Sequence, residues 1–175
     1  MIGKIKQLIK KNDKLYSRLA LINRIGFKLW FINIIFQRIF RRHSNLNFNV
    51  HFTSSIAIGE NIKFHRDMNT LASFAISGNC YFQAINGITL GESVLFAPGV
   101  KLISSNHDMN NNAIATHAKP IIIGNNVWLG ADVIILPEVE IGNNCIIGAG
   151  SIVTKSFKEN DLVIAGNPAR IIKKT

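Results

Sequence analysis

His107 has a sequence setting that could support acid–base chemistry. It lies in the stretch SSNHD (residues 104–108), where a regular pattern of apolar residues gives way to a polar segment. A neutral imidazole with a pKa near ~6.5 can accept a proton at neutral pH, so this side chain is a candidate general base. Taken alone, a histidine in a polar segment is more often only solvated. The other histidines have no comparable setting: His43, His51, His65 and His117.

The neighbours of His107 could orient its ring. Both Asn106 and Asp108 are candidates, and the sequence leaves open which of them faces the imidazole. A second group of polar residues lies near the C-terminus, where basic side chains suit an anionic ligand and otherwise form a solvated terminus. This group consists of Thr154, Lys155, Arg170 and Lys173.

The two cysteines, Cys80 and Cys145, do not indicate a metal site. Neither belongs to a CxxC pair, and each follows a Gly-Asn turn at a position where small apolar residues recur. We therefore expect two buried thiols, no disulfide, no metal, and a reduced, cytoplasmic setting.

An apolar residue recurs every six positions after this segment. Cut in sixes, residues 123–158 read IGNNVW LGADVI ILPEVE IGNNCI IGAGSI VTKSFK. Each block opens with an aliphatic residue and has a small or apolar residue at its fifth place, so that this residue and the next opener point to one side of a strand. Six is neither a helical period nor the alternation of a plain strand; it fits a short strand followed by a tight corner, where Gly and Asn tolerate positive φ.

Three such units would close a triangular coil of about 18 residues, and stacked coils would pair as parallel sheets. The pattern predicts an all-β domain over residues 46–175, a parallel β-helix of about five coils. The stretch 103–120 breaks the period, so we expect an extruded loop there. The C-terminal tail leaves the repeat at residues 166–168.

The N-terminal quarter holds all the excess charge. The chain has a net charge of +10; residues 1–42 contain 11 Lys and Arg and one acid, and the remaining residues are balanced. This distribution argues against nucleic-acid binding by the repeat region. We expect residues 1–45 to form basic amphipathic α-helices, broken near Gly26, that precede the β-helix. Residues 1–42 would either contact a membrane surface or cap the β-helix and pack against neighbouring subunits.

Four separate stretches, in order, resemble one protein family. They are LGESVLFAPGVKLI, SSNHD, IIIGNNVWLGADVII and the closing GAGSIVTK with NDLVIAGNPARII, and the resemblance covers about residues 50–173. The chain resembles the hexapeptide-repeat acyltransferases, in particular the maltose, galactoside and polysaccharide O-acetyltransferases. The resemblance implies a left-handed β-helix, whereas the general rule for parallel crossovers would give the opposite hand.

The resemblance also implies the site. In such an enzyme His107 removes the proton of a sugar hydroxyl, and the backbone N–H of Ala131 from an adjacent subunit stabilises the oxyanion. Trp128 would line the acceptor side, with a subunit contact as the equal alternative. The resemblance places acetyl-CoA along backbone groups of Ala131 and Ala149, with its phosphates near the basic group defined above, and implies a homotrimer.

The sequence leaves the acceptor open. The coil CYFQAINGITLGE matches the sugar acetyltransferases less closely, and Asn79, Gln83 and Asn86 are all candidates for acceptor contact. We expect acetyl transfer to a sugar in surface polysaccharide or lipopolysaccharide assembly, at the inner face of the membrane. The alternatives are N-acetylation of an amino sugar or antibiotic and a non-catalytic β-helix scaffold. A zinc carbonic anhydrase of this fold needs a pair of histidines spaced five apart, which is absent here.

Overall fold

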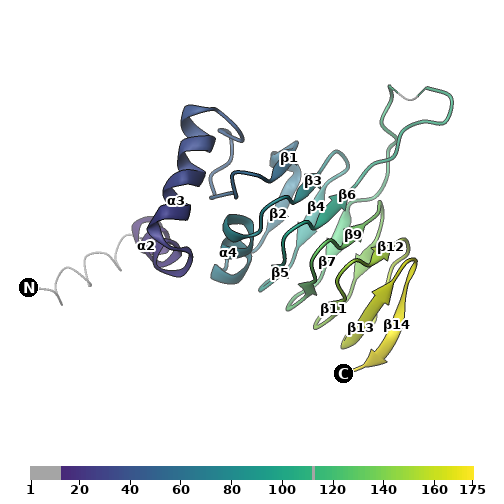
Figure 1. Ribbon diagram of the computed structural model, residues 1–175. Helices are drawn as coiled ribbons and strands as arrows, with labels where there is room; N and C mark the ends of the chain where they lie inside the picture. Colours follow the sequence, from purple (N-terminus) through teal and green to yellow (C-terminus); the bar gives the residue numbers. More distant parts are fainter. Residues whose placement is uncertain (1–12, 112) are drawn as a thin grey trace, which may run out of the picture.

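Three parallel sheets form the walls of a prism. The computed structural model describes residues 13–111 and 113–175, and most turns of the chain add one strand to each wall (Figure 1). Sheet A contains β1 (Ser55–Ala57), β3 (Tyr81–Gln83), β6 (Lys101–Ile103), β9 (Ile134–Ile135) and β12 (Ile152–Val153). Sheet B contains β2 (Ile62–Phe64), β4 (Ile88–Leu90), β7 (Ile121–Ile123) and β10 (Glu140–Ile141). Sheet C contains β5 (Leu95–Phe96), β8 (Trp128–Leu129), β11 (Ile146–Ile147), β13 (Leu162–Gly166) and β14 (Ala169–Lys174).

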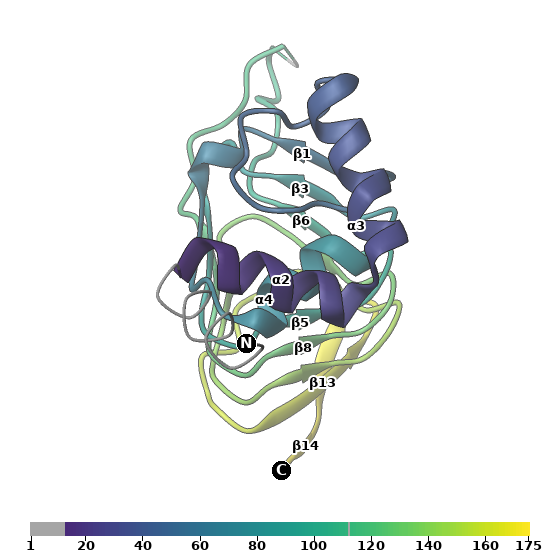
Figure 2. The same ribbon diagram turned by 90° about the vertical axis from the view of Figure 1, so that its left-hand side faces the viewer.

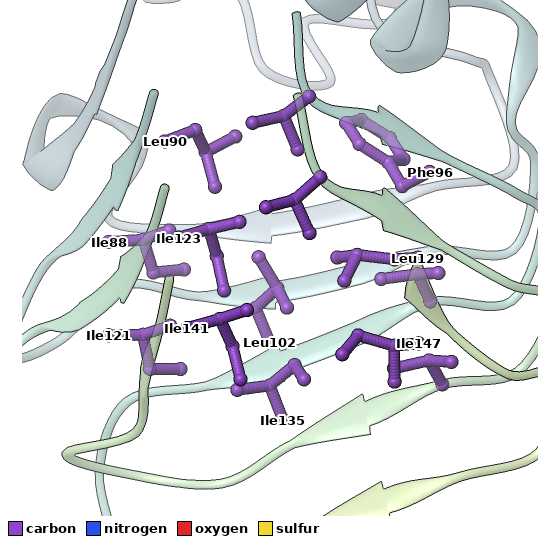
Figure 3. Close-up of a cluster of buried hydrophobic side chains, with 14 of the residues drawn as sticks. Ile88, Leu90, Phe96, Leu102, Ile121, Ile123, Leu129, Ile135, Ile141 and Ile147 are labelled. Carbon is purple, nitrogen blue, oxygen red and sulfur yellow. The ribbon is translucent and has the colours of Figure 1, made fainter. Parts of the chain in front are cut away.

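The predicted inward positions form the core of the prism. The aliphatic block openers are almost fully buried and stack in three pairs, of which Figure 3 shows the first two: Ile123 with Ile141, Leu129 with Ile147, and Ile135 with Val153. The fifth positions are buried beside them, including both thiols, Cys80 and Cys145, and this burial raises the pKa of each thiol. Five strands in sheet A confirm the prediction of about five coils.

A ladder of asparagine side chains holds the coils together between sheets B and C. The side-chain oxygens of Asn125, Asn143 and Asn160 accept hydrogen bonds, each of 2.8 Å, from the backbone N–H groups of Glu92, Asn125 and Asn143. Beside the ladder a Cβ on Gly124 would approach the carbonyl oxygen of Gly142 to 2.8 Å. Glycine is therefore required here because stacked backbones meet closely.

The first coil differs from the prediction of an all-β domain over residues 46–175. Instead, the helix α4 (Met68–Ile76) occupies the place of a strand beside β5. Asp67 caps this helix by accepting from the backbone N–H of Asn69 and Thr70, at 2.8 and 3.0 Å. Side chains of α4 then bond the edge of β5, since Thr70 Oγ1 accepts from Val94 N at 3.1 Å. The helix thus covers a sheet edge that would otherwise be open.

Two further helices cover the same end of the prism (Figure 2). They are α2 (Asp13–Ile25) and α3 (Phe27–Ile34), and α3 continues as the π-helical turn η1 (Ile35–Ile39). Gly26 separates them with φ of +84°, as the sequence predicted. We call residues 17–52 together with α4 the cap. The predicted helical pattern of residues 1–12 lies outside the described residues.

The cap buries polar side chains of α3 and η1. Asn33 and Gln37 are 0% and 3% exposed. Asn33 donates to the side chain of Asn49 at 2.7 Å and accepts from Phe52 N at 3.0 Å. Gln37 donates to Phe48 O at 3.0 Å and accepts from Val50 N. These amides fix the extended segment that enters the first coil, because every polar group of that segment needs a partner once buried.

The outer surface of α2 and α3 is partly apolar. Among residues 13–111 and 113–175, no single helix is long and apolar enough to cross a bilayer. The two segments Ser17–Ile25 and Phe27–Ile39 together have the length and composition of a membrane span, but the chain bends by 113° between them.

Candidate active site

His107 lies on a ribbon that projects from the prism after β6 (Figure 1). Residues 106–108 pair with residues 114–116: His107 forms an antiparallel bridge with Ala115, and Thr116 N donates to Asn106 O at 2.8 Å. The predicted extruded loop is therefore paired at its base. The side chain of His107 is exposed at the point where the ribbon leaves the prism.

The preceding coil positions the ribbon. Gln83 Oε1 accepts from Ser105 N at 3.1 Å, and Asn86 Nδ2 donates to Ser104 O and Thr116 O at 2.9 and 2.8 Å. Gln83 and Asn86, two of the candidates for acceptor contact, therefore support the ribbon. For Asn86 the spacing was the available signal, because it lies one coil, 18 residues, before Ser104.

The Asp108 carboxylate is engaged away from the ring of His107. Its Oδ1 accepts from the backbone N–H groups of Asn110 and Asn111 at 2.7 and 3.0 Å, which closes a turn in the ribbon. Asn106 contributes its backbone oxygen to the ribbon and leaves its side chain exposed. Within the described part of the chain, neither residue bonds the imidazole.

A second column of residues lies at the corner between sheets C and A, which we call the alanine corner (residues 97–100, 130–133, 148–151 and 166–168). Register between β8 and β11 places Ala131 one coil, ~4.8 Å, below Ala149. The backbone N–H groups of both alanines have no acceptor among the described residues. A column of small residues with free donors is suited to contact with a thin chain bearing amide carbonyls.

The candidate residues occupy two different corners of the prism. His107 lies at the corner between sheets A and B, where Thr154 and Lys155 also turn from β12 towards Phe157, the residue that bridges to sheet B. We call this the ribbon corner (residues 84–87, 104–120, 136–139 and 154–156). Ala131 and Ala149 lie at the alanine corner, at the other edge of sheet A.

The basic group expected to meet the cofactor phosphates is therefore divided within one chain. Arg170 and Lys173 are on β14, which pairs antiparallel with β13 in sheet C. Thr154 and Lys155 are exposed at the ribbon corner, and the Lys155 amine lies 5.6 Å from the centre of the Phe157 ring. The two pairs are separated because the tail folds back along sheet C instead of extending past β12, and their contact with cofactor phosphates stays a prediction.

Trp128 is on the outer face of sheet C, between Leu95 of β5 and Ile146 of β11. Its side chain is 51% exposed and borders a hollow of about 250 Å³ between β5, β8 and α4. Ile76 and Leu95 also line this hollow and are partly exposed. The position is suited either to an acceptor contact or to a subunit contact.

No group of three His, Cys, Asp or Glu side chains that could hold a metal ion occurs among residues 13–111 and 113–175. Asn79, the third residue considered for acceptor contact, is exposed at a corner with φ of +57°.

Comparison with known proteins identifies the repeat. Residues 120–155 match the family model "Bacterial transferase hexapeptide (six repeats)". The chain is 46% identical over 89 residues to a galactoside O-acetyltransferase of Escherichia coli K12, covering 49% of this chain and 43% of that protein. It is 32% identical over 151 residues to the putative lipopolysaccharide biosynthesis O-acetyl transferase WbbJ of the same organism, covering 77% and 74%.

The fold comparison agrees. A crystal structure of a maltose O-acetyltransferase from Clostridium difficile 630 superposes with a TM-score of 0.57 at 34% identity, covering 69% of this chain and 63% of that one. The chain spans about half the length of the first curated relatives that it matches, 43% and 50%.

Proposed function

This chain belongs to the left-handed β-helix acyltransferases of the hexapeptide-repeat family, and we propose that it transfers an acetyl group from acetyl-CoA to a sugar hydroxyl. The observation that carries the proposal is the pairing of two features: an exposed histidine on a braced ribbon, and a column of small residues with free backbone donors at the alanine corner. Relatives named galactoside, maltose and lipopolysaccharide O-acetyltransferases support the sugar class of the acceptor.

The chemistry follows from these groups. His107 accepts the proton of the sugar hydroxyl while the hydroxyl oxygen attacks the thioester carbonyl. The resulting oxyanion meets the N–H of Ala131, which needs no reorganisation because it already lacks an acceptor. When the C–S bond breaks, the thiolate of coenzyme A leaves and takes the proton from the imidazolium. The acetyl ester is formed, and the histidine returns to its neutral state.

The same geometry favours a homotrimer as part of the proposal. His107 and Ala131 lie at different corners of one prism, on opposite edges of sheet A. They form one site only when the ribbon corner of one chain faces the alanine corner of the next. Three chains arranged in a ring would form this contact three times. At each contact the alanine corner would then lie near the basic residues of both corners.

The acceptor is proposed to be a sugar of a surface polysaccharide or lipopolysaccharide. The support is the relative named for lipopolysaccharide biosynthesis, which this chain covers over 74% of its length. An amino-sugar acceptor would need the same base and the same backbone donors at the alanine corner. The two acceptor classes are distinguished by the product, which is an amide for an amino sugar and an ester for a hydroxyl.

Removal of the base tests the mechanism. His107→Ala should lower kcat roughly 10²–10⁴-fold, the usual contribution of a positioned general base. Acetyl-CoA binding should change little, because the alanine corner lies on other coils. Turnover is measured as thiol release with a panel of nucleotide sugars and oligosaccharides, corrected for release without acceptor. His117→Ala, on the same loop, is the control and should keep most of its activity; loss of activity in this variant alone would transfer the role to His117.

Mixed trimers test the shared site. Ala131→Pro removes the backbone donor, so this variant and His107→Ala should each be inactive alone. Co-expressed chains should regain activity, because some sites then combine an intact histidine with an intact N–H. Light scattering that gave the 19.4 kDa mass of one chain would contradict the trimer. Mixed trimers without activity would contradict the shared site.

A further inference from the structure

The cap contains a cavity that the acetyl-transfer site does not use. It has a volume of about 700 Å³ and is bounded by α2, α3, η1 and the chain before the first coil. Its apolar wall includes Trp30, Phe48 and Leu71. Three guanidinium groups also line it, from Arg18, Arg38 and Arg66. An apolar chamber with cations around it suits an amphiphile with an anionic head.

Two of the arginines are braced without being neutralised. Arg38 donates to the backbone oxygen of Ser44 at 2.7 Å, and Arg66 donates to the side chain of Asn47 at 2.6 Å. Among the described residues no ion pair involves any of the three arginines. The acid nearest to Arg66 in sequence, Asp67, uses both oxygens at α4 and Ser93. The cavity therefore keeps a fixed, uncompensated positive charge.

A buried donor at the cavity also lacks a partner. Asn49 lines the cavity and is 6% exposed. Its oxygen accepts from Asn33, but its amide nitrogen is buried without a hydrogen bond within the described part of the chain. A buried donor without an acceptor costs roughly 1–3 kcal/mol. An anion in the cavity would supply acceptor atoms beside it.

The cavity is continuous with an exposed aromatic surface. Trp30 lies with its ring centre 6.1 Å from that of Phe27, which stacks on Phe31 at 5.7 Å. Phe27 and Phe31 are 61% and 47% exposed. Further along the same helical segment, Ile39 and Phe40 are 71% and 66% exposed. We call these four exposed residues the aromatic edge.

Charge decides what covers this surface. Residues 14–59 contain no acid, so two copies of this face would repel each other. Residues 1–12 carry four lysines and no acid, so they are equally unsuited to a cavity lined by arginines. A lipid membrane with anionic headgroups matches both features, because it offers phosphate to the arginines and hydrocarbon to the phenylalanines.

We propose that the cap binds an anionic phospholipid, with its phosphate held by Arg18, Arg38 and Arg66 and its chain against Trp30 and the aromatic edge. The site holds one lipid of a bilayer surface on which the prism stands by its capped end. This binding is independent of acetyl transfer, because none of these residues belongs to the ribbon corner or the alanine corner.

Binding of a soluble lipid tests the cavity. In a Trp128→Phe background, the fluorescence of Trp30, then the remaining tryptophan, reports titration with dihexanoyl phosphatidic acid. Arg18→Gln with Arg66→Gln should weaken binding roughly 30-fold, at ~1 kcal/mol for each well-placed basic residue. The control is Arg41→Gln with Arg42→Gln, which removes equal charge from exposed residues outside the cavity. This control should stay within about twofold.

Other outcomes overturn the proposal. Equal losses of lipid affinity in the two double arginine variants would show that binding depends on diffuse surface charge. Inorganic phosphate that bound as tightly as the lipid would show a site for free phosphate. With vesicles of phosphatidylcholine and phosphatidylglycerol in equal parts, Phe27→Ser with Phe31→Ser should abolish co-sedimentation, and pure phosphatidylcholine should not bind. If that variant bound vesicles normally and changed the mass in light scattering, the aromatic edge would be a contact between copies of the chain.

Thiol release with a soluble sugar separates this proposal from the proposed function. The arginine variants, made for this assay in the chain that keeps Trp128, should keep their turnover, and circular dichroism should show an unchanged fold. A variant that lost both lipid binding and helical signal would be replaced by Arg18→Gln alone, which removes a side chain that lines the cavity and has no hydrogen bond or ion pair among the described residues.

Discussion

The prism and the helical segment formed by α3 and η1 bury opposite kinds of side chain. In the prism, aliphatic residues such as Leu129 and Ile135 are 0% exposed. In the helical segment, Asn33 of α3 and Gln37 of η1 are buried while Phe27 and Phe31 lie at the surface. The prism is therefore stabilised mainly by apolar burial, whereas the attachment of α3 depends on directional hydrogen bonds to the chain entering the first coil.

This difference separates two uses of apolar residues. Residues that fill the prism repeat with the coil and are needed for folding. Residues of the aromatic edge follow no such repeat and are not needed to fill a core, so their exposure calls for an external partner. The comparison is tested by substituting buried and exposed residues in each region and measuring the effect on stability.

The largest effect should come from a cavity in the prism. Ile135→Ala should lower the free energy of unfolding by about 2–5 kcal/mol, because the side chain is fully buried among neighbouring coils. Phe27→Ala should change it by no more than about 0.5 kcal/mol, since its larger ring is 61% exposed. Urea unfolding at one protein concentration measures both. Comparable losses from the two substitutions would break the distinction between the regions.

An intermediate effect is expected where a polar residue of the cap becomes apolar. Asn33→Leu leaves Phe52 N and the carbonyl of Ala75 without their partner, which should cost about 1–3 kcal/mol. Hydrogen exchange should show faster opening of residues 48–52 while the prism stays protected. The matched control is Ile32→Asn, on the exposed side of the same helix, which should leave exchange unchanged. Protection kept in Asn33→Leu would mean that packing, and not the amides, holds the cap.

The smallest effect is the pH response of the cap. Burial chiefly lowers the pKa of His43 below its ordinary value of 6.5, against a hydrogen bond to Ser54 and with help from the charge of Arg42. Burial also lowers the pKa of His51. As the pH falls, the two histidines therefore become protonated in the unfolded chain before they do so in the folded one. Their contribution to the free energy of unfolding is complete above pH 6.5 and declines as the pH falls from 6.5 towards the lowered pKa values of the folded state.

Thermal melting between pH about 7.5 and about 5 checks this response. A double variant, His43→Gln with His51→Gln, should show a shallower decline over that window. A melting temperature that rose as the pH fell through 6.5, or a decline as steep in the double variant, would contradict the assignment to these two histidines.

The repeat made the prism predictable, because six-residue spacing places Ile123, Leu129 and Ile135 inside irrespective of distant contacts. The turn at Gly26 and the ribbon after Ile103 were equally local. The helix α4 could not be predicted in this way, because its place in the first coil depends on a distant sheet edge that needs covering. The division of the candidate site between two corners also escaped the sequence, since it depends on which corner each loop closes.

The asparagine ladder has a consequence for the length of the molecule. Each coil presents to the next the same amide, glycine and strand edge, so nothing inside the prism determines how many coils it contains. The ladder accepts coils of two lengths, because Asn125 and Asn143 lie 18 residues apart and Asn143 and Asn160 lie 17 apart. Height is instead fixed by the two ends that are unlike the middle, α4 with its covering helices and the reversed strand β14. In evolutionary terms, the distance between those ends can change only in steps of one coil.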